Sequence, residues 1–72
     1  MQIDVGSFYR CRNGTEVEIF DMSSTFVFGV YVDGNGKRQG SYWYEDTGQY
    51  GPAERKQKHE MDLIEFVGGD VE

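Results

Sequence analysis

Residues 26–45 read FVFGVYVDGNGKRQGSYWYE, which is the pattern of a long β-hairpin. Up to Val32, apolar and aromatic residues alternate between the two faces of an extended chain with a period of two, as in a half-buried strand. Residues 33–36 (DGNG) supply the turn, because Asp-Gly and Asn-Gly pairs tolerate the positive φ angles of tight hairpins. This hairpin indicates a β-sheet domain.

Three further strand-like runs flank the hairpin. They are residues 8–12 (FYRCR), 15–20 (TEVEIF) and 61–67 (MDLIEFV), and turn residues recur at Asn13, Asp33, Asp46 and Gly51. Short strands at this spacing are typical of a small antiparallel barrel or sandwich. We predict an all-β fold over residues 1–67, a five-stranded antiparallel SH3-like barrel or strongly bent sheet. A C-terminal tail is expected at 68–72, and an exposed loop or single helical turn at 53–58.

The length of 72 residues allows one domain and limits its core. Chains of this size bury only about 60% of their unfolded surface, so they are marginally stable without further support. Cys11 is the only cysteine, which excludes a disulfide within the chain and a cysteine-ligated metal site. The remaining support is oligomerisation or a dense aromatic core, and the 15% aromatic content favours the latter. No cofactor and no metal ion is predicted.

The charge balance narrows the choice of partners. Thirteen acidic and seven basic residues give a net charge of −6, without the basic stripe of duplex DNA binders. We therefore expect no duplex nucleic acid as partner. The charge suits a partner with a basic groove, although solubility is the simpler interpretation.

The first residues and the hydropathy suggest the compartment. Met1–Asp4 has neither the basic start nor the apolar run of a signal peptide. No stretch approaches the ~20 apolar residues of a membrane span, so no membrane association is expected. Together with the single cysteine, this predicts a reducing cytoplasm.

Candidate catalytic groups are few. His59 is the only histidine and lies in the charged run KQKHE, which favours a solvated loop residue. Cys11 stands between two arginines, which can depress a thiol pKa, but alternation places them on the opposite face and favours a small core residue. Residues 33–36 resemble part of a calcium loop but lack the distal glutamate, so a hairpin turn explains them better. We predict that the protein is not an enzyme.

A binding surface is better supported than a catalytic one. Exposed Tyr and Trp rings stack on bases or anchor protein interfaces, and arginine binds phosphate in a bidentate manner. The predicted ligand-binding residues are Arg10, Arg12, Tyr31, Arg38, Tyr42, Trp43, Tyr44 and Tyr50. The alternative is that the tyrosines complete the core and the arginines cover its rim.

Four blocks of the chain show a resemblance to a known group. They are residues 5–14 (VGSFYRCRNG), 28–34 (FGVYVDG), 42–50 (YWYEDTGQY) and 61–64 (MDLI). In this order they resemble the small orphan SH3-like β domains encoded by tailed bacteriophages, with Thr47 inserted between the acidic residue and the glycine of the third block. The resemblance covers about residues 5–66 and is a fold signature, not a catalytic motif. It implies phage origin, and so action in the cytoplasm of an infected bacterium.

Small early phage proteins act against host functions, and two hypotheses follow from this resemblance. The first is a counter-defence sponge that sequesters a host nucleotide second messenger between aromatic rings and arginines, in a pocket shared by a homo-oligomer. The second is a stoichiometric inhibitor that binds a host defence or nucleic-acid enzyme through an aromatic patch with an acidic rim. An accessory domain without a defence target is a third possibility.

Overall fold

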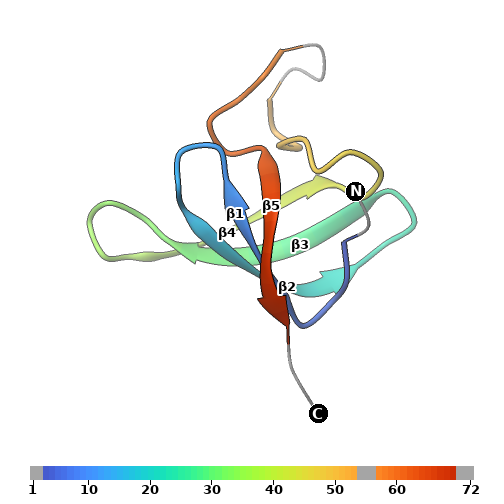
Figure 1. Ribbon diagram of the computed structural model, residues 1–72, viewed down its shortest axis with the longest axis horizontal. Helices are drawn as coiled ribbons and strands as arrows, with labels where there is room; N and C mark the ends of the chain where they lie inside the picture. The colour runs from blue at the N-terminus through green and yellow to red at the C-terminus, as the bar shows by residue number, and fades with distance from the viewer. Residues whose placement is uncertain (1–2, 54–56, 70–72) are drawn as a thin grey trace.

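The computed structural model describes residues 3–53 and 57–69, which form one antiparallel sheet (Figure 1). Its strands are β1 (Ser7–Cys11), β2 (Glu16–Met22), β3 (Phe26–Val32), β4 (Arg38–Tyr44) and β5 (Leu63–Gly69). Their order in the sheet is β4-β3-β2-β1-β5, so the first four strands form a meander and β5 returns to pair with β1. The predicted all-β, five-stranded architecture is confirmed.

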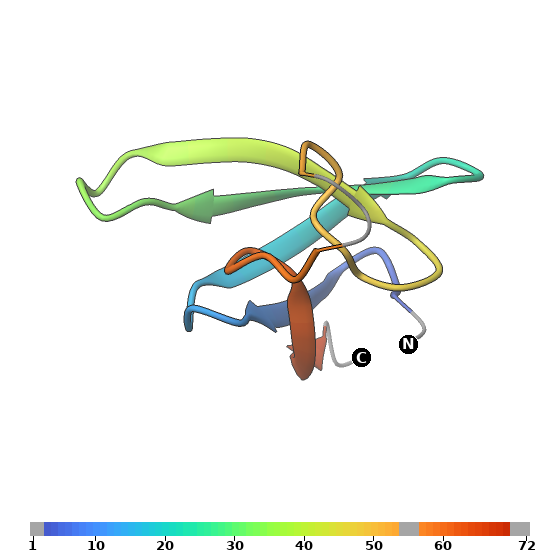
Figure 2. The ribbon, with the colours of Figure 1, turned by 90° about the horizontal axis from the view of Figure 1, so that it is seen from above.

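The sheet is open and bends strongly about β2. The first residues of β2 pair with β1, from Arg10↔Glu16 to Phe8↔Glu18, whereas the pairs with β3 begin at Glu18↔Val30 and run to the end of the strand. Figure 2 shows the result: the β3–β4 hairpin lies at one level, β1 and β5 at another, and β2 passes between them. The concave side of this bend holds the core.

Local side-chain chemistry fixes the turns of the β1–β2 and β3–β4 hairpins. The Asn13 side chain accepts a hydrogen bond from the Thr15 backbone N–H (2.9 Å), and Gly14 has a φ of 91°. In the β3–β4 hairpin Asp33 Oδ1 accepts hydrogen bonds from two backbone N–H groups, and Gly36 has a φ of 79°. These are the Asx contacts and left-handed glycines that such turns need. The hairpin interpretation of residues 33–36 is confirmed.

The core is centred on a single tryptophan. Its members are Ile3, Tyr9, Cys11, Val17, Ile19, Val27, Trp43, Met61 and Leu63. Trp43 is fully buried, and its indole N–H donates a hydrogen bond to the Met61 carbonyl (2.7 Å). Gly29 lets β2 and β3 approach, because a Cβ there would lie 2.5 Å from Val17 Cγ1. The predicted inward orientation of Val17 and Ile19 is confirmed.

The last strand differs from its expected form. We expected Leu63 to be buried beside Ile64 or Phe66, but Leu63 is buried while Ile64 and Phe66 are 46% and 59% exposed. Two register shifts against β1 interrupt the alternation of β5, so a period of two does not describe its faces. β5 also extends to Gly69, so the expected tail includes two residues of the strand.

Other expectations fall partly outside the described residues. Positions 70–72 of the tail and 54–56 of the expected loop or helical turn belong to the part of the chain that is not described. Within the described ranges, no helix has the length and apolar character needed to cross a membrane.

Candidate functional site

The predicted aromatic patch is divided between the two faces of the sheet. Trp43 lies on the inner face with Tyr31 and Tyr50, whose ring centroids are 6.4 Å and 5.8 Å from its own. Tyr42 and Tyr44, its neighbours in β4, project from the outer face because side chains alternate along a strand. The predicted ligand-binding residues therefore do not form one surface, and the fully buried Trp43 does not face a ligand.

The inner rings close the open side of the bent sheet. Tyr50 packs between Trp43 and His59, and its ring is stacked on the imidazole at 4.8 Å. His59 is half-buried instead of solvated as expected, and its Nδ1 accepts a hydrogen bond from the Met61 backbone N–H (3.0 Å). These residues hold positions 48–53 and 57–62 over the core. For Tyr50 the structure favours the alternative that it completes the core.

Asp62 is the polar centre of this closure, and sequence reasoning missed it. The residue is only 5% exposed, and its carboxylate accepts hydrogen bonds from the backbone N–H groups of Tyr50 and His59, both at 2.9 Å. Burial alone raises its pKa, but these two hydrogen bonds and Arg12 outweigh burial, so the pKa of Asp62 lies below its usual value. The available signal was its place in the Asp-Leu-Ile block.

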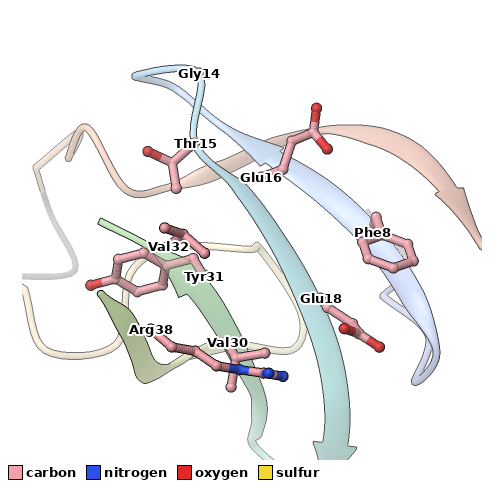
Figure 3. Close-up of a pocket in the computed structure, with 9 residues that line it drawn as sticks. All are labelled: Phe8, Gly14, Thr15, Glu16, Glu18, Val30, Tyr31, Val32 and Arg38. Carbon is pink, nitrogen blue, oxygen red and sulfur yellow. The ribbon is translucent and has the colours of Figure 1, made fainter. Parts of the chain in front are cut away.

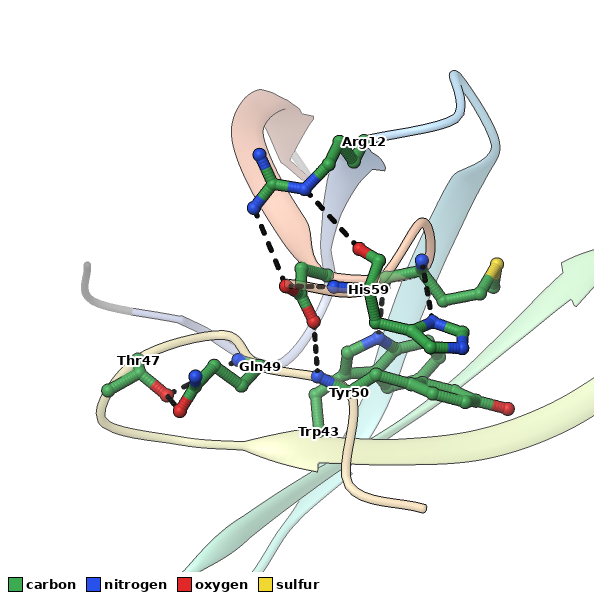
Figure 4. Close-up of polar contacts among 8 residues, drawn as sticks. Arg12, Trp43, Thr47, Gln49, Tyr50 and His59 are labelled. Carbon is green, nitrogen blue, oxygen red and sulfur yellow. Dashed lines mark hydrogen bonds and ion pairs between the residues drawn. The ribbon is translucent and has the colours of Figure 1, made fainter. Parts of the chain in front are cut away.

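Arg12 is committed to this closure. Its guanidinium lies 3.4 Å from Asp62 Oδ2, and its Nε–H donates to the His59 carbonyl (3.3 Å), as Figure 4 shows for Arg12 and His59. Because the buried carboxylate depends on this partner, Arg12 has a structural role.

Arg10 is also occupied. Its guanidinium forms ion pairs with Glu65 on β5 (2.5 Å) and Glu16 on β2 (3.4 Å). The hydrogen bond to Glu65 and the charge of that residue raise the pKa of Arg10. The group bridges three strands across the outer face of the sheet, and two carboxylates already neutralise it.

Tyr31 and Arg38, the remaining predicted residues, line a groove of about 580 Å³ between the start of β2 and the end of β3 (Figure 3). The lining residues are Phe8, Gly14, Thr15, Glu16, Glu18, Val30, Tyr31, Val32 and Arg38. Burial, followed by Tyr50, raises the pKa of Tyr31, so its phenol is neutral. Glu18 and Arg38 form no ion pair with any described residue. Two carboxylates and one guanidinium thus face this groove, which we call the β2–β3 groove.

A second surface lies farther along the outer face, on β3 and β4. Phe26 contacts Tyr42 and Tyr44 with ring centroids 5.1 Å and 5.0 Å apart. We call these three residues the outer cluster. Tyr42 is 36% exposed and the other two rings are half-buried. All five strands belong to one sheet, so no described strand packs over these rings.

The lone cysteine has no catalytic environment. Cys11 is 1% exposed, and burial, followed by the charge of Asp62, raises the pKa of its thiol to about 12. A neutral, buried thiol is a poor nucleophile, so the interpretation of Cys11 as a core residue is confirmed. Among the described residues, no three His, Cys, Asp or Glu side chains gather in a way that would hold a metal ion.

In comparisons with known proteins, the chain matches no family model, no curated protein and no solved structure. The resemblance to phage-encoded domains therefore stays a prediction.

Proposed function

We propose that this protein is a non-enzymatic binding protein that docks on a partner protein through the outer cluster. The observation that carries this proposal is the contact of Phe26 with Tyr42 and Tyr44 on the sheet face opposite the core. Partly exposed aromatic rings are the side chains that most often anchor protein interfaces. Gly51 lies against the Tyr42 ring, which nevertheless stays 36% exposed, and an exposed apolar patch is a sign of such a site.

The charges around the outer cluster indicate the kind of partner. Asp21 pairs with Phe28 at the edge of the cluster, and Glu45 and Asp46 directly follow Tyr44. Together with the net charge of −6, this acidic rim favours association with a basic surface. A protein that binds nucleic acids presents such a surface.

The resemblance to phage-encoded domains supplies the setting. In this proposal the protein acts in the cytoplasm of an infected bacterium as a stoichiometric inhibitor of a host defence or nucleic-acid enzyme. It contributes no catalytic group and occupies the partner's basic surface.

Capture from bacterial lysate tests this function when it is done with matched variants. The wild-type chain and an Ile64→Ser control, altered on exposed β5, are expected to retain the same host protein in stoichiometric amount. Phe26→Ser, which removes the central ring of the outer cluster, and the charge reversal Glu45→Lys are expected to lose it. Capture should weaken as salt screens the rim. A partner retained equally by all four proteins would contradict the proposal.

A second candidate function is the nucleotide sponge, and the β2–β3 groove is the observation that favours it. Its volume of about 580 Å³ is suitable for a small ligand, and it brings together Tyr31 and Arg38. A homo-oligomer would enclose the ligand further. Glu18 opposes this function, because it has no ion-pair partner among the described residues and places a negative charge beside any phosphate group in the groove. A nucleotide that binds in calorimetry and is lost on Arg38→Gln would establish it.

A further inference from the structure

The β2–β3 groove exists because the ladder between the two strands stops early. β2 begins at Glu16 and β3 continues to Val32, yet their pairing ends at Glu18↔Val30. In this register the next hydrogen-bonded pair, here called the missing rung, would be Glu16 and Val32. Instead, the start of β2 follows β1 and the end of β3 follows β4, and the two diverge (Figure 2).

The backbone groups of the missing rung point into the groove. The Cys11 N–H donates to the Thr15 carbonyl, so the backbone polar groups of Thr15 face β1 and those of the next residue, Glu16, face β3. On the other side, the Asp33 N–H donates to the Lys37 carbonyl across the β3–β4 turn. The backbone polar groups of Val32, one residue earlier, therefore face β2. The two walls of the groove are therefore strand edges whose backbone groups, at Glu16 and Val32, are not paired with each other.

The side chains of these walls define the chemistry of an occupant. Glu18 stands between Phe8 and Val30 in the cross-strand row Phe8↔Glu18↔Val30. Figure 3 shows Arg38 beside Val30 on the far wall of the groove. A basic side chain next to Glu18 would gain an opposite charge and an apolar bed for its methylene groups.

We infer that the β2–β3 groove accepts an extended segment of the partner protein, with a basic side chain set against Glu18 and its backbone paired to Glu16 and Val32. The segment would be antiparallel to one wall and parallel to the other, as in mixed sheets. This inference rests on the proposed function and specifies its partner. A second copy of this chain is disfavoured as occupant because it carries the same net charge of −6.

Hydrogen exchange in the ¹⁵N-labelled full chain tests the missing rung directly. The amides of Glu16 and Val32 are expected to exchange much faster than those of Glu18 and Val30, which lie within the ladder. Equal protection of all four amides in the free protein would mean that the rung is formed, and the inference would be wrong.

Titration with a short synthetic peptide that alternates lysine and valine tests the occupant. The peptide is expected to shift and protect the Glu16 and Val32 amides, while a peptide alternating glutamate and valine does neither. Glu18→Gln should weaken binding about threefold, and Arg38→Gln should strengthen it by a similar factor, as expected for single charges in contact with solvent. Neither group forms an ion pair with a described residue, so both variants should keep the wild-type melting temperature.

The possible failures are distinct. If the lysine peptide leaves the two amides unchanged, or if the glutamate peptide binds equally well, the groove does not accept a basic segment. A nucleotide that shifts the same amides and depends on Arg38 would also overturn the inference. If a host partner is still captured through Phe26 in any of these cases, the proposed function stands without it.

Discussion

Replacement of Asp62 by alanine is expected to release the segment that closes over Trp43. The side chain is 5% exposed and accepts two backbone hydrogen bonds at 2.9 Å, in addition to its ion pair with Arg12. Removal leaves two backbone N–H groups and one guanidinium without their acceptor. Breaking a buried charged group's contacts in this way costs about 3–5 kcal/mol.

That loss is large relative to the whole stability. A domain of 72 residues unfolds with a free energy of about 4–10 kcal/mol, so the alanine variant is expected to populate the unfolded state. Asp62→Asn keeps one carbonyl acceptor and is expected to lose about 2 kcal/mol, as for one charge-assisted hydrogen bond. With a urea slope of about 1 kcal/mol per molar, its unfolding midpoint falls by about 2 M.

Trp43 is the only tryptophan and reports this transition by its fluorescence, because its indole N–H binds the carbonyl of Met61 beside Asp62. Urea unfolding of wild type, Asp62→Asn and Asp62→Ala should therefore show two successive losses. Asp21→Asn is the matched control on an exposed carboxylate and should stay within about 0.5 kcal/mol of wild type. An Asp62→Ala variant as stable as this control would refute the reasoning.

Three further predictions follow from the same contacts. The pKa of Asp62 is lowered in the folded protein, so its contribution to stability is complete above the ordinary aspartate pKa and is lost as pH falls through the lowered value. The stability of Asp62→Asn should therefore depend less on pH than that of the wild type in acid unfolding. Gly29→Ala should cost about 1–3 kcal/mol because its Cβ meets Val17 and the Glu18 carbonyl, whereas Gly34→Ala, where a Cβ meets nothing within 4 Å, should be neutral in thermal unfolding. Cys11 should resist a thiol reagent at pH 8 in the native protein and react once urea unfolds it, since its thiol is buried and its pKa is about 12; rapid native labelling would contradict this.

Much of the fold could be predicted because its determinants are local. The Asn13 and Asp33 side chains set their own turns, and alternation assigns the inner residues of the first four strands. The inner residues of β5 could not be predicted in this way, because its two register shifts against β1 depend on residues more than 50 positions away. A period of two cannot reveal where a strand is interrupted by bulges.

The candidate site was harder to predict for the same physical reason. Alternation already separated Trp43 from Tyr42 and Tyr44, so the division of the aromatic patch was readable from the sequence. The engagement of Arg10 by Glu65 and of Arg12 by Asp62 was not, because it requires the β1–β5 pairing. The β2–β3 groove likewise arises from where a ladder ends, a property of the three-dimensional bend.

The native mass of the protein after exposure to bacterial lysate tests the central claim most directly. The account predicts a stoichiometric complex with one host protein for the wild type and its absence for Phe26→Ser, with no mass gained from a panel of linear and cyclic nucleotides. A homo-oligomer that carries nucleotide and ignores host proteins would contradict the account and establish the sponge instead.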